Sequence, residues 1–296
     1  MSTTASPREL DHLVLPTAAL DTARIRLEAL GFTVAPIGVH PFGTENACIY
    51  LADGTFLEPL VVGDPAKAAE AVAANNVFVA RDQAFRERNG AEGLSAVVFA
   101  TRNADADHDA FVRAGVSAGP RLDFSRPFVD ASGKEDTASF RLAFAAETAV
   151  PDTFFFTCER ANAPKVDRSA LQAHTNGARR ITAVVGCAED PAGHRQFFEA
   201  VTGAPVTSPA AGRIEVCLPN AAIAIADAAG FSIEFGLDAP SGSPLRLAAI
   251  VFGVASLSQA KAHFDAGGVG YQQRGSRLVV PPAAGQGAIF AFEELS

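Results

Sequence analysis

The feature that most constrains this chain is an internal repeat of one strand, one helix and one glycine. Each copy has an apolar, β-rich run, a polar helix-start signal, a helical stretch and a glycine suited to a helix end. Alternating apolar runs broken by turns follow each glycine, as in ACIYLADGTFLEPLVV, where Asp53-Gly54 signals a hairpin. Each copy therefore predicts a βαβββ module. The four copies have nearly equal intervals from strand to glycine: His12 to Gly31, Ser95 to Gly115, Thr182 to Gly203, and Ala248 to Gly267.

Four such modules predict an α+β fold with two cupped, barrel-like mixed sheets. The strands of one module cannot bury their inner face alone, and pairing two modules curls their strands into an open cup. The segment 159–173 is polar, carries a proline and lacks strand periodicity, so it predicts a linker. We therefore expect a first domain over 1–160, from modules one and two, and a second over 174–296, from modules three and four. An insertion at 63–93 has a helical pattern.

Charge and hydropathy narrow the class of partner. The net charge of −9 has the wrong sign for a protein that binds the phosphate backbone, so no nucleic-acid partner is expected. No apolar run reaches the roughly 20 residues of a membrane span. The start MSTTASPREL has neither the basic nor the apolar region of a signal peptide. These observations predict a cytoplasmic protein with a small-molecule ligand and no membrane partner, and they leave a homodimer open.

Two polar residues fall on strands of the first module that should line its cup. His12 lies on the first strand and Glu58 on the last. Strand alternation predicts that His12 shares a face with Val14, and Glu58 with Phe56. A polar pair pointing into an apolar cup is costly unless it is used, so we predict that the two side chains face each other there. The structural alternative for His12 is a hydrogen-bonded histidine at the rim.

Further candidate residues lie on loops and on the second module. His40 precedes Gly43 on a loop, where it can bind substrate or act as a general base, or can simply cap a turn. Arg126, between two phenylalanines, can clamp a carboxylate or an enolate oxygen, or can lie on the surface. The remaining candidates for substrate binding are Thr44 and Asn46 on the His40 loop, and His174 and Asn176 where the linker enters the second domain.

The paired βαβββ pattern resembles the vicinal-oxygen-chelate superfamily, which includes glyoxalase I, extradiol dioxygenases and bleomycin-resistance proteins. Three segments resemble the glyoxalase-like domain family more narrowly: LDHLVLPTAALDTARIRLEALGFTV, HPFGTEN from His40, and TFLE ending at Glu58. HTNGARR from His174 resembles a second signature of that family. The resemblance covers most of the chain and implies the fold, but fold does not fix function.

The resemblance also implies where a divalent metal would bind. In that superfamily the ligands come from the first and last strands of each module in a pair. His12 and Glu58 fill two of the four positions in the first domain, where Zn, Fe, Mn or Ni would suit them, but Ser95 and Phe156 or Thr157 occupy the other two. The second domain looks metal-free. Its positions hold Thr182, Asp227 or Glu234, Ala248 and Glu293.

Two functions from different classes fit these residues. The first is a lyase or isomerase of the glyoxalase type that acts on a small enolisable carbonyl compound, with Glu58 or His40 as the base and a metal or Arg126 at the oxyanion. The second is a binding protein that sequesters a small, partly aromatic ligand without turnover. A ring-cleaving dioxygenase is disfavoured, because Thr182 and Ala248 stand where the second domain would need histidines.

Overall fold

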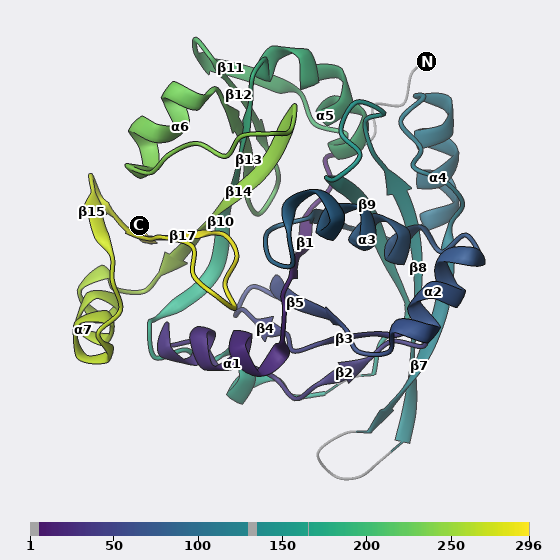
Figure 1. Cartoon of the computed structure of the whole chain (residues 1–296), viewed down its shortest axis with the longest axis horizontal. Coiled ribbons are helices and arrows are strands. Elements are labelled where there is room, and N and C mark those ends of the chain that lie inside the picture. Colours follow the sequence, from purple (N-terminus) through teal and green to yellow (C-terminus); the bar gives the residue numbers. More distant parts are fainter. Residues whose placement is uncertain (1–5, 130–134, 165, 296) are drawn as a thin grey trace.

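A computed structural model of the chain describes residues 6–129, 135–164 and 166–295, which form two mixed sheets and their helices (Figure 1). Each sheet is built from two βαβββ modules, as the repeat predicted. The first strands of the paired modules run antiparallel at the centre of each sheet, and the last strand of each module pairs parallel with its first. The predicted α+β class and the cupped sheets are therefore confirmed.

The strands of the first sheet come from the first half of the chain. Their order is β2 (Gly38–Val39), β3 (Thr44–Asn46), β5 (Phe56–Val62), β1 (Leu10–Pro16), β6 (Ala96–Thr101), β9 (Phe154–Asn162), β8 (Glu135–Ala145) and β7 (Leu122–Val129), with β4 (Ile49–Tyr50) also on β5.

The second sheet follows the same plan. Its order is β11 (Val206–Ala210), β12 (Arg213–Cys217), β13 (Ala222–Ala226), β10 (Ala178–Ala188), β14 (Leu245–Val254), β17 (Ile289–Glu294), β16 (Arg277–Val280) and β15 (Gln272–Arg274). It forms the green-to-yellow half of Figure 1.

The helices divide into those of the repeat and those of insertions. The repeat helices are α1 (Leu20–Ala29), α4 (Ala104–Arg113), α5 (Arg195–Thr202), which follows the 3-10 turn η2 (Pro191–His194), and α7 (Leu257–Gly267). The insertion helices are α2 (Pro65–Ala73) and α3 (Val77–Asn89) after β5, and α6 (Ala228–Phe235) after β13. A further 3-10 turn, η1 (Ser169–Gln172), lies between the two sheets in sequence.

The repeat helices end as their sequence predicts, with one shift. Gly31, Gly115 and Gly203 have φ values of 86°, 71° and 67°, the left-handed region that glycine enters at little cost. In the fourth module Gly267 is the last helical residue, and its neighbour Gly268 takes the left-handed conformation (φ 64°) instead. The predicted helix end was therefore one residue early.

One apolar core joins the helix-covered faces of the two sheets. It contains Leu13 and Leu27 from β1 and α1 together with Ile250 and Phe264 from β14 and α7. The division of the chain at 160 and 174 into two domains stays a prediction, because this shared core does not test whether either half folds alone. No helix in the described ranges is long and apolar enough to cross a membrane.

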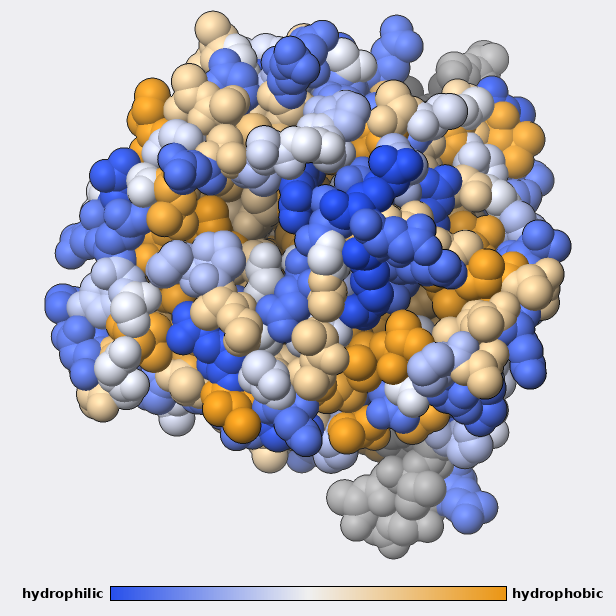
Figure 2. All heavy atoms as spheres, in the orientation of Figure 1, coloured by the Kyte–Doolittle hydropathy of each residue, from blue (hydrophilic) through white to orange (hydrophobic). Residues whose placement is uncertain are grey.

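The insertion helices pack differently on the concave faces of the two sheets. In the second sheet, α6 packs Phe231 and Phe235 against the strands, and both side chains are fully buried. In the first sheet, α2 and α3 contribute Ala68 and Phe78 to a cluster with Val14 of β1. Gln83, Glu87 and Arg88 of α3 are exposed, and Figure 2 shows hydrophilic side chains gathered over this helix. The second concavity is thus filled by a helix, whereas the first is covered.

Arg86 ties α3 to the strands that carry the first cavity. Its guanidinium donates to the carbonyls of Thr17 and Leu60, at 3.0 and 2.9 Å, and to the carboxylate of Asp82 at 2.7 Å. Asp82 is 1% exposed, and burial raises the pKa of its carboxyl despite the nearby guanidinium. The pair is a buried anchor for the insertion.

We expect Arg86→Met to lower the free energy of unfolding by about 3 kcal/mol, since it strands a buried carboxylate and several carbonyl oxygens. Denaturant unfolding measures this. Arg88→Met, at an exposed position of the same helix, is the matched control and should change stability by less than about 0.5 kcal/mol. Equal effects in the two variants would contradict the anchoring role.

Another polar contact links the first half of the chain to the second. The Nδ1 atom of His194 lies 2.7 Å from a carboxylate oxygen of Glu147. Burial disfavours the charged imidazole, but the hydrogen bond and charge of Glu147 outweigh it and raise the pKa of His194 above 6.5. The contact therefore stabilises the fold fully below about pH 6.5, and its contribution is lost as the pH rises through the higher folded-state pKa.

We expect the wild type to exceed Glu147→Gln in unfolding free energy by on the order of 1 kcal/mol more at acidic pH than at alkaline pH. Denaturant melts below pH 6.5 and at alkaline pH, above the raised pKa of His194, measure the difference. A gap that does not vary with pH would show that His194 is not charged by this contact.

Candidate active site

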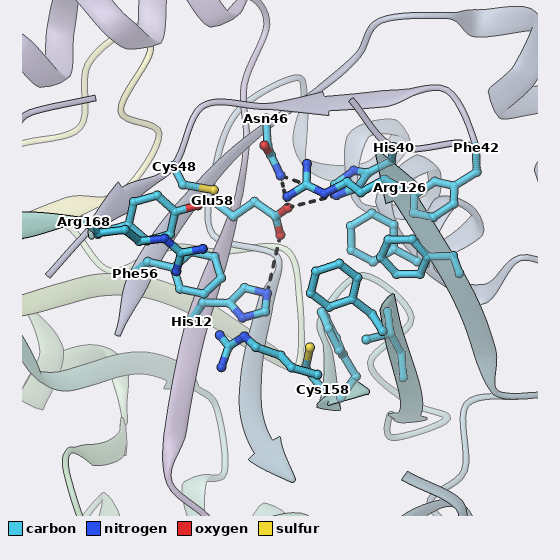
Figure 3. Close-up of a pocket in the computed structure, with 17 residues that line it drawn as sticks. His12, His40, Phe42, Asn46, Cys48, Phe56, Glu58, Arg126, Cys158 and Arg168 are labelled. Atoms are coloured by element: carbon cyan, nitrogen blue, oxygen red, sulfur yellow. Dashed lines mark hydrogen bonds and ion pairs between the residues drawn. The ribbon is translucent and has the colours of Figure 1, made fainter. Parts of the chain in front are cut away.

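The concave face of the first sheet holds a cavity of about 90 Å³ with a polar centre and an aromatic wall (Figure 3). The sequence-predicted residues that line it are His12, His40, Asn46, Glu58 and Arg126. The other lining residues are Phe42, Cys48, Tyr50, Phe56, Phe78, Phe124, Phe140, Leu142, Phe156, Cys158, Arg160 and Arg168. Five of the predicted residues, from separate parts of the first half, therefore meet at one site.

Parallel pairing of β1 and β5 places His12 and Glu58 on the same face. In the register, Val14 lies opposite Glu58 and His12 opposite Phe56, so the two polar residues are one pleat apart. The Nε2 atom of His12 is 3.5 Å from the Oε2 atom of Glu58. Leu13, Leu15 and Leu57 point the other way, into the core beneath α1. Strand alternation thus separates an apolar face from the face that carries His12 and Glu58.

Glu58 is a buried carboxylate at the centre of the site, with 5% of its surface exposed. Asn46 donates its amide N–H to Oε1 at 2.6 Å, and the Nε2 atom of His40 lies 3.7 Å from the same oxygen. Burial alone would favour the protonated acid, but His12, His40 and Asn46 together lower the pKa of Glu58 to about 2. The side chain is therefore ionised at neutral pH and can accept a proton.

His12 lies between two carboxylates. Its Nδ1 atom is 3.4 Å from Asp11 Oδ2, while Nε2 faces Glu58, and its ring stacks on Phe56 with centroids 4.3 Å apart. Burial opposes a charge on this ring, but Asp11 and Glu58 outweigh burial and raise the pKa of His12. The two carboxylates thus favour the protonated form of His12, which is the form that can donate a proton to a bound oxygen.

His40 provides a neutral imidazole on the other side of Glu58. Burial lowers its pKa to about 4, so the ring is uncharged at pH 7. Its Nδ1 atom hydrogen-bonds Thr44 Oγ1 at 2.9 Å, and its ring stacks on Phe42. Thr44 does not line the cavity; it orients His40. The predicted contact of Thr44 with substrate therefore has no direct geometric support.

Arg126 reaches the cavity from β7, at the seam where the first sheet nearly closes. A Cβ atom added to Gly38 on β2 would lie 2.4 Å from Arg126 Nη1 and 2.5 Å from Asn46 Oδ1, so only glycine leaves room for the guanidinium there. The two edge strands of the sheet thus approach each other around Arg126. Its half-buried charge lies beside His40 and Asn46 (Figure 3).

His174 and Asn176 do not join this group. The Nδ1 atom of His174 accepts the backbone N–H of Thr33 at 3.0 Å, and Nε2 lies 3.0 Å from the carbonyl oxygen of Tyr50. Asn176 is fully buried and donates to the carbonyl oxygen of Leu30 at 2.8 Å. Both side chains are engaged with backbone, so the structure places them in the junction of the two halves and outside the cavity.

Sequence reasoning missed several polar residues of the site. Asp11 is buried between His12 and Arg160, whose guanidinium lies 2.5 Å from its carboxylate. Arg168 stands over the ring of Tyr50. Adjacency to His12 could have flagged Asp11. Arg160 lies on β9 and alternates with Phe156 and Cys158, so strand periodicity could have flagged it had the linker not been placed from 159. No signal marked Arg168, which falls within the segment interpreted as linker.

The cysteines of the cavity are not nucleophiles. Burial raises the pKa of the Cys48 thiol to about 12, and that of Cys158 is raised further for the same reason. A thiolate is the reactive form, so both remain inert at neutral pH. Cys217 is exposed on β12, and all four cysteines are free.

The sequence profile of the family described as "Glyoxalase-like domain" matches residues 10–202. The chain belongs to the glyoxalase-like domain family. The match includes both modules of the first sheet and every residue that lines the cavity. No curated protein matches the chain.

Solved structures with the same fold include several members of the superfamily. A hypothetical protein from Staphylococcus aureus is 16% identical, with a TM-score of 0.66 over 97% of this chain and 99% of that one. A mutant of 4-hydroxymandelate synthase from Streptomyces coelicolor is 13% identical (TM-score 0.61; 98% and 93%). A Mn(II)-bound glyoxalase from Novosphingobium aromaticivorans is 11% identical (TM-score 0.54; 98% and 82%). Identities this low establish the fold alone.

The donor set does not fit a divalent metal as it is arranged. Among the described residues, no group of three or more His, Cys, Asp or Glu side chains could hold a metal ion. Each nitrogen of His12 faces a different carboxylate, and His40 lies on the far oxygen of Glu58. The guanidinium groups of Arg126 and Arg168 line the same small space and would repel a cation. The predicted pair of metal ligands, His12 and Glu58, therefore supplies two donors without a third.

We expect His12→Ala and Glu58→Ala each to lower the unfolding free energy by less than about 2 kcal/mol while abolishing ligand binding, because a cavity-lining polar group contributes little packing. Leu57→Ala, which empties a core position on the other face of β5, is the matched control and should cost about 2–5 kcal/mol. Thermal or denaturant melts measure both. A larger loss in the first two variants with binding intact would make the pair a structural contact.

Proposed function

We propose that this glyoxalase-like protein is an enzyme that abstracts a proton beside the carbonyl group of a small enolisable compound bound in the cavity of the first sheet. The observation that carries the proposal is the buried, ionised Glu58, which faces an aromatic cavity between two imidazoles whose pKa values are shifted in opposite directions. Burying a carboxylate away from water costs free energy, so a fold gains nothing from one there unless the group has a function. Perturbed titrating groups in a cavity are typical of catalytic sites.

The residues divide the chemistry as follows. Glu58 accepts the proton from the carbon next to the carbonyl, which leaves the electron pair on an enolate. Arg126 stabilises the enolate oxygen by charge-assisted hydrogen bonds. His12 can donate its proton to that oxygen, and Asn46 holds the Glu58 carboxylate in place. His40, neutral at pH 7, is a second proton acceptor on the opposite side of Glu58.

A second function is favoured by one specific observation. A pKa of about 2 makes Glu58 a weak base, because general bases work best with pKa values near the working pH. Binding of a small, partly aromatic ligand without turnover would need only the cavity, the arginines and the phenylalanines. The two functions differ in whether a proton leaves the bound ligand.

Exchange of carbon-bound protons with D2O, followed by NMR, separates them. We expect the wild type to speed the exchange of protons next to the carbonyl in hydroxyacetone or in levulinate, and Glu58→Gln to slow that exchange about 100-fold. Glu293→Gln, which changes a carboxylate on the last strand of the second sheet, is the matched control and should retain the wild-type rate. Equal rates in the wild type and Glu58→Gln would leave sequestration as the function.

The same assay tests the metal. A structural neighbour is a Mn(II)-bound glyoxalase, so a divalent metal that would polarise the carbonyl as a Lewis acid is the alternative to test, although His12 and Glu58 supply only two donors for it. The donor set favours Arg126 in that role. We therefore expect exchange to persist after dialysis against EDTA, and loss of exchange that Mn²⁺ restores would assign the metal instead.

A further inference from the structure

Arg168 is a cationic group at the cavity that the proposed proton transfer does not use. It directly precedes η1, in the segment that connects the two sheets, and its side chain is half-buried. The guanidinium carbon lies 4.5 Å from the centre of the Tyr50 ring, a cation–π contact that orients the group. Arg168 and Tyr50 both line the cavity.

The segment that carries Arg168 is fixed to the first sheet. Gln172 donates its side-chain amide to the carbonyl oxygen of Leu51 at 3.0 Å, and His174 hydrogen-bonds the carbonyl oxygen of Tyr50. Thr33 donates its hydroxyl to the carbonyl oxygen of Ala173 at 2.6 Å. These contacts fix the C-terminal end of the turn, and the contact with the Tyr50 ring orients the Arg168 side chain, so the group is pre-organised for a ligand.

The charges that line the cavity do not balance. Three arginines line it, against the single carboxylate of Glu58. Arg160 is neutralised by Asp11, outside the lining. Within the described part of the chain, neither Arg126 nor Arg168 forms an ion pair or hydrogen bond with a carboxylate. A partly desolvated guanidinium without a counter-ion favours an anionic ligand, and its planar fork matches a carboxylate.

The two arginines lie at different places relative to Glu58. Figure 3 shows Arg126 beside Asn46 and His40, and Arg168 on the other side of Glu58, beside Phe56 and Cys48. A ligand that places its carbonyl oxygen near Arg126 therefore extends its remaining atoms toward Arg168. The wall between them is aromatic, since the rings of His12, Phe56 and Tyr50 follow one another at centroid distances of 4.3 and 5.5 Å.

We propose that the ligand of this cavity is a small carboxylate with an apolar or aromatic body, and that Arg168 binds its carboxylate group. The inference deepens the proposed function and rests on that function for the placement of the ligand. It assigns Arg126 to the reacting oxygen and Arg168 to substrate selection. His174 gains a role as a positioning residue, because its hydrogen bond to Tyr50 supports the platform under Arg168.

Phenylacetate and its neutral isostere phenylacetamide test the inference by calorimetric titration of the full chain. We expect phenylacetate to bind at least about tenfold more tightly than the amide. Arg168→Met should weaken phenylacetate binding about tenfold and leave the amide unchanged, whereas Arg168→Lys should recover part of the loss. Arg180→Met removes an exposed arginine outside the cavity and should leave both affinities unchanged. Matching melting temperatures establish that the variants fold.

Three outcomes would overturn the inference: equal affinity for acid and amide, no binding of phenylacetate at millimolar concentration, or an equal loss in Arg168→Met and Arg180→Met. The proposed function fails separately. If Glu58-dependent exchange of neutral hydroxyacetone stands while the preference for the acid is absent, only the carboxylate assignment falls. If the preference stands and no exchange is seen, the enzyme assignment falls and the carboxylate site remains.

Discussion

The buried charge of Glu58 is the constraint on which the site depends. A carboxylate removed from water must be offset by donors and positive charge. A continuous polar chain across the concave face meets this need: Asp11, His12, Glu58, Asn46, His40 and Thr44 follow one another, with contacts between 2.6 and 3.5 Å. At one end of this series of side chains Asp11 pairs with Arg160, and at the other end His40 lies beside Arg126.

The two sheets show how one plan yields a cavity in one half and a packed core in the other. Each carries its insertion at the same topological place, after the last strand of the first module in the pair. In the second sheet α6 fills the concavity with two phenylalanines. Five polar residues of this half also have hydrogen-bond or ion-pair partners. Hydrogen bonds and ion pairs connect Thr182, Glu293, Arg277, Glu234 and Arg213 in one series.

Much of the fold and part of the site could be predicted from the sequence. The repeat fixes the modules, because strand and helix periodicities are local properties. Alternation then puts His12 and Glu58 on one face, and the register of β1 with β5 bears this out. The prediction that Arg126 contributes to the site required only that β7 belong to the same concave sheet. These inferences needed no knowledge of how distant loops pack.

The parts that sequence reasoning missed depend on packing between distant segments. The segment 159–173 has no periodicity, yet docking by Gln172 and His174 turns it into a wall of the cavity. His174 was predicted to touch substrate, and its polar atoms instead serve this docking. The overall composition also gave no indication of the electrostatic potential inside the cavity. The chain carries a net charge of −9, but the cavity concentrates guanidinium groups within low-dielectric walls, which focus their potential inward. An acidic protein can therefore select an anion, because the charges nearest the ligand outweigh a more distant and solvent-screened surface.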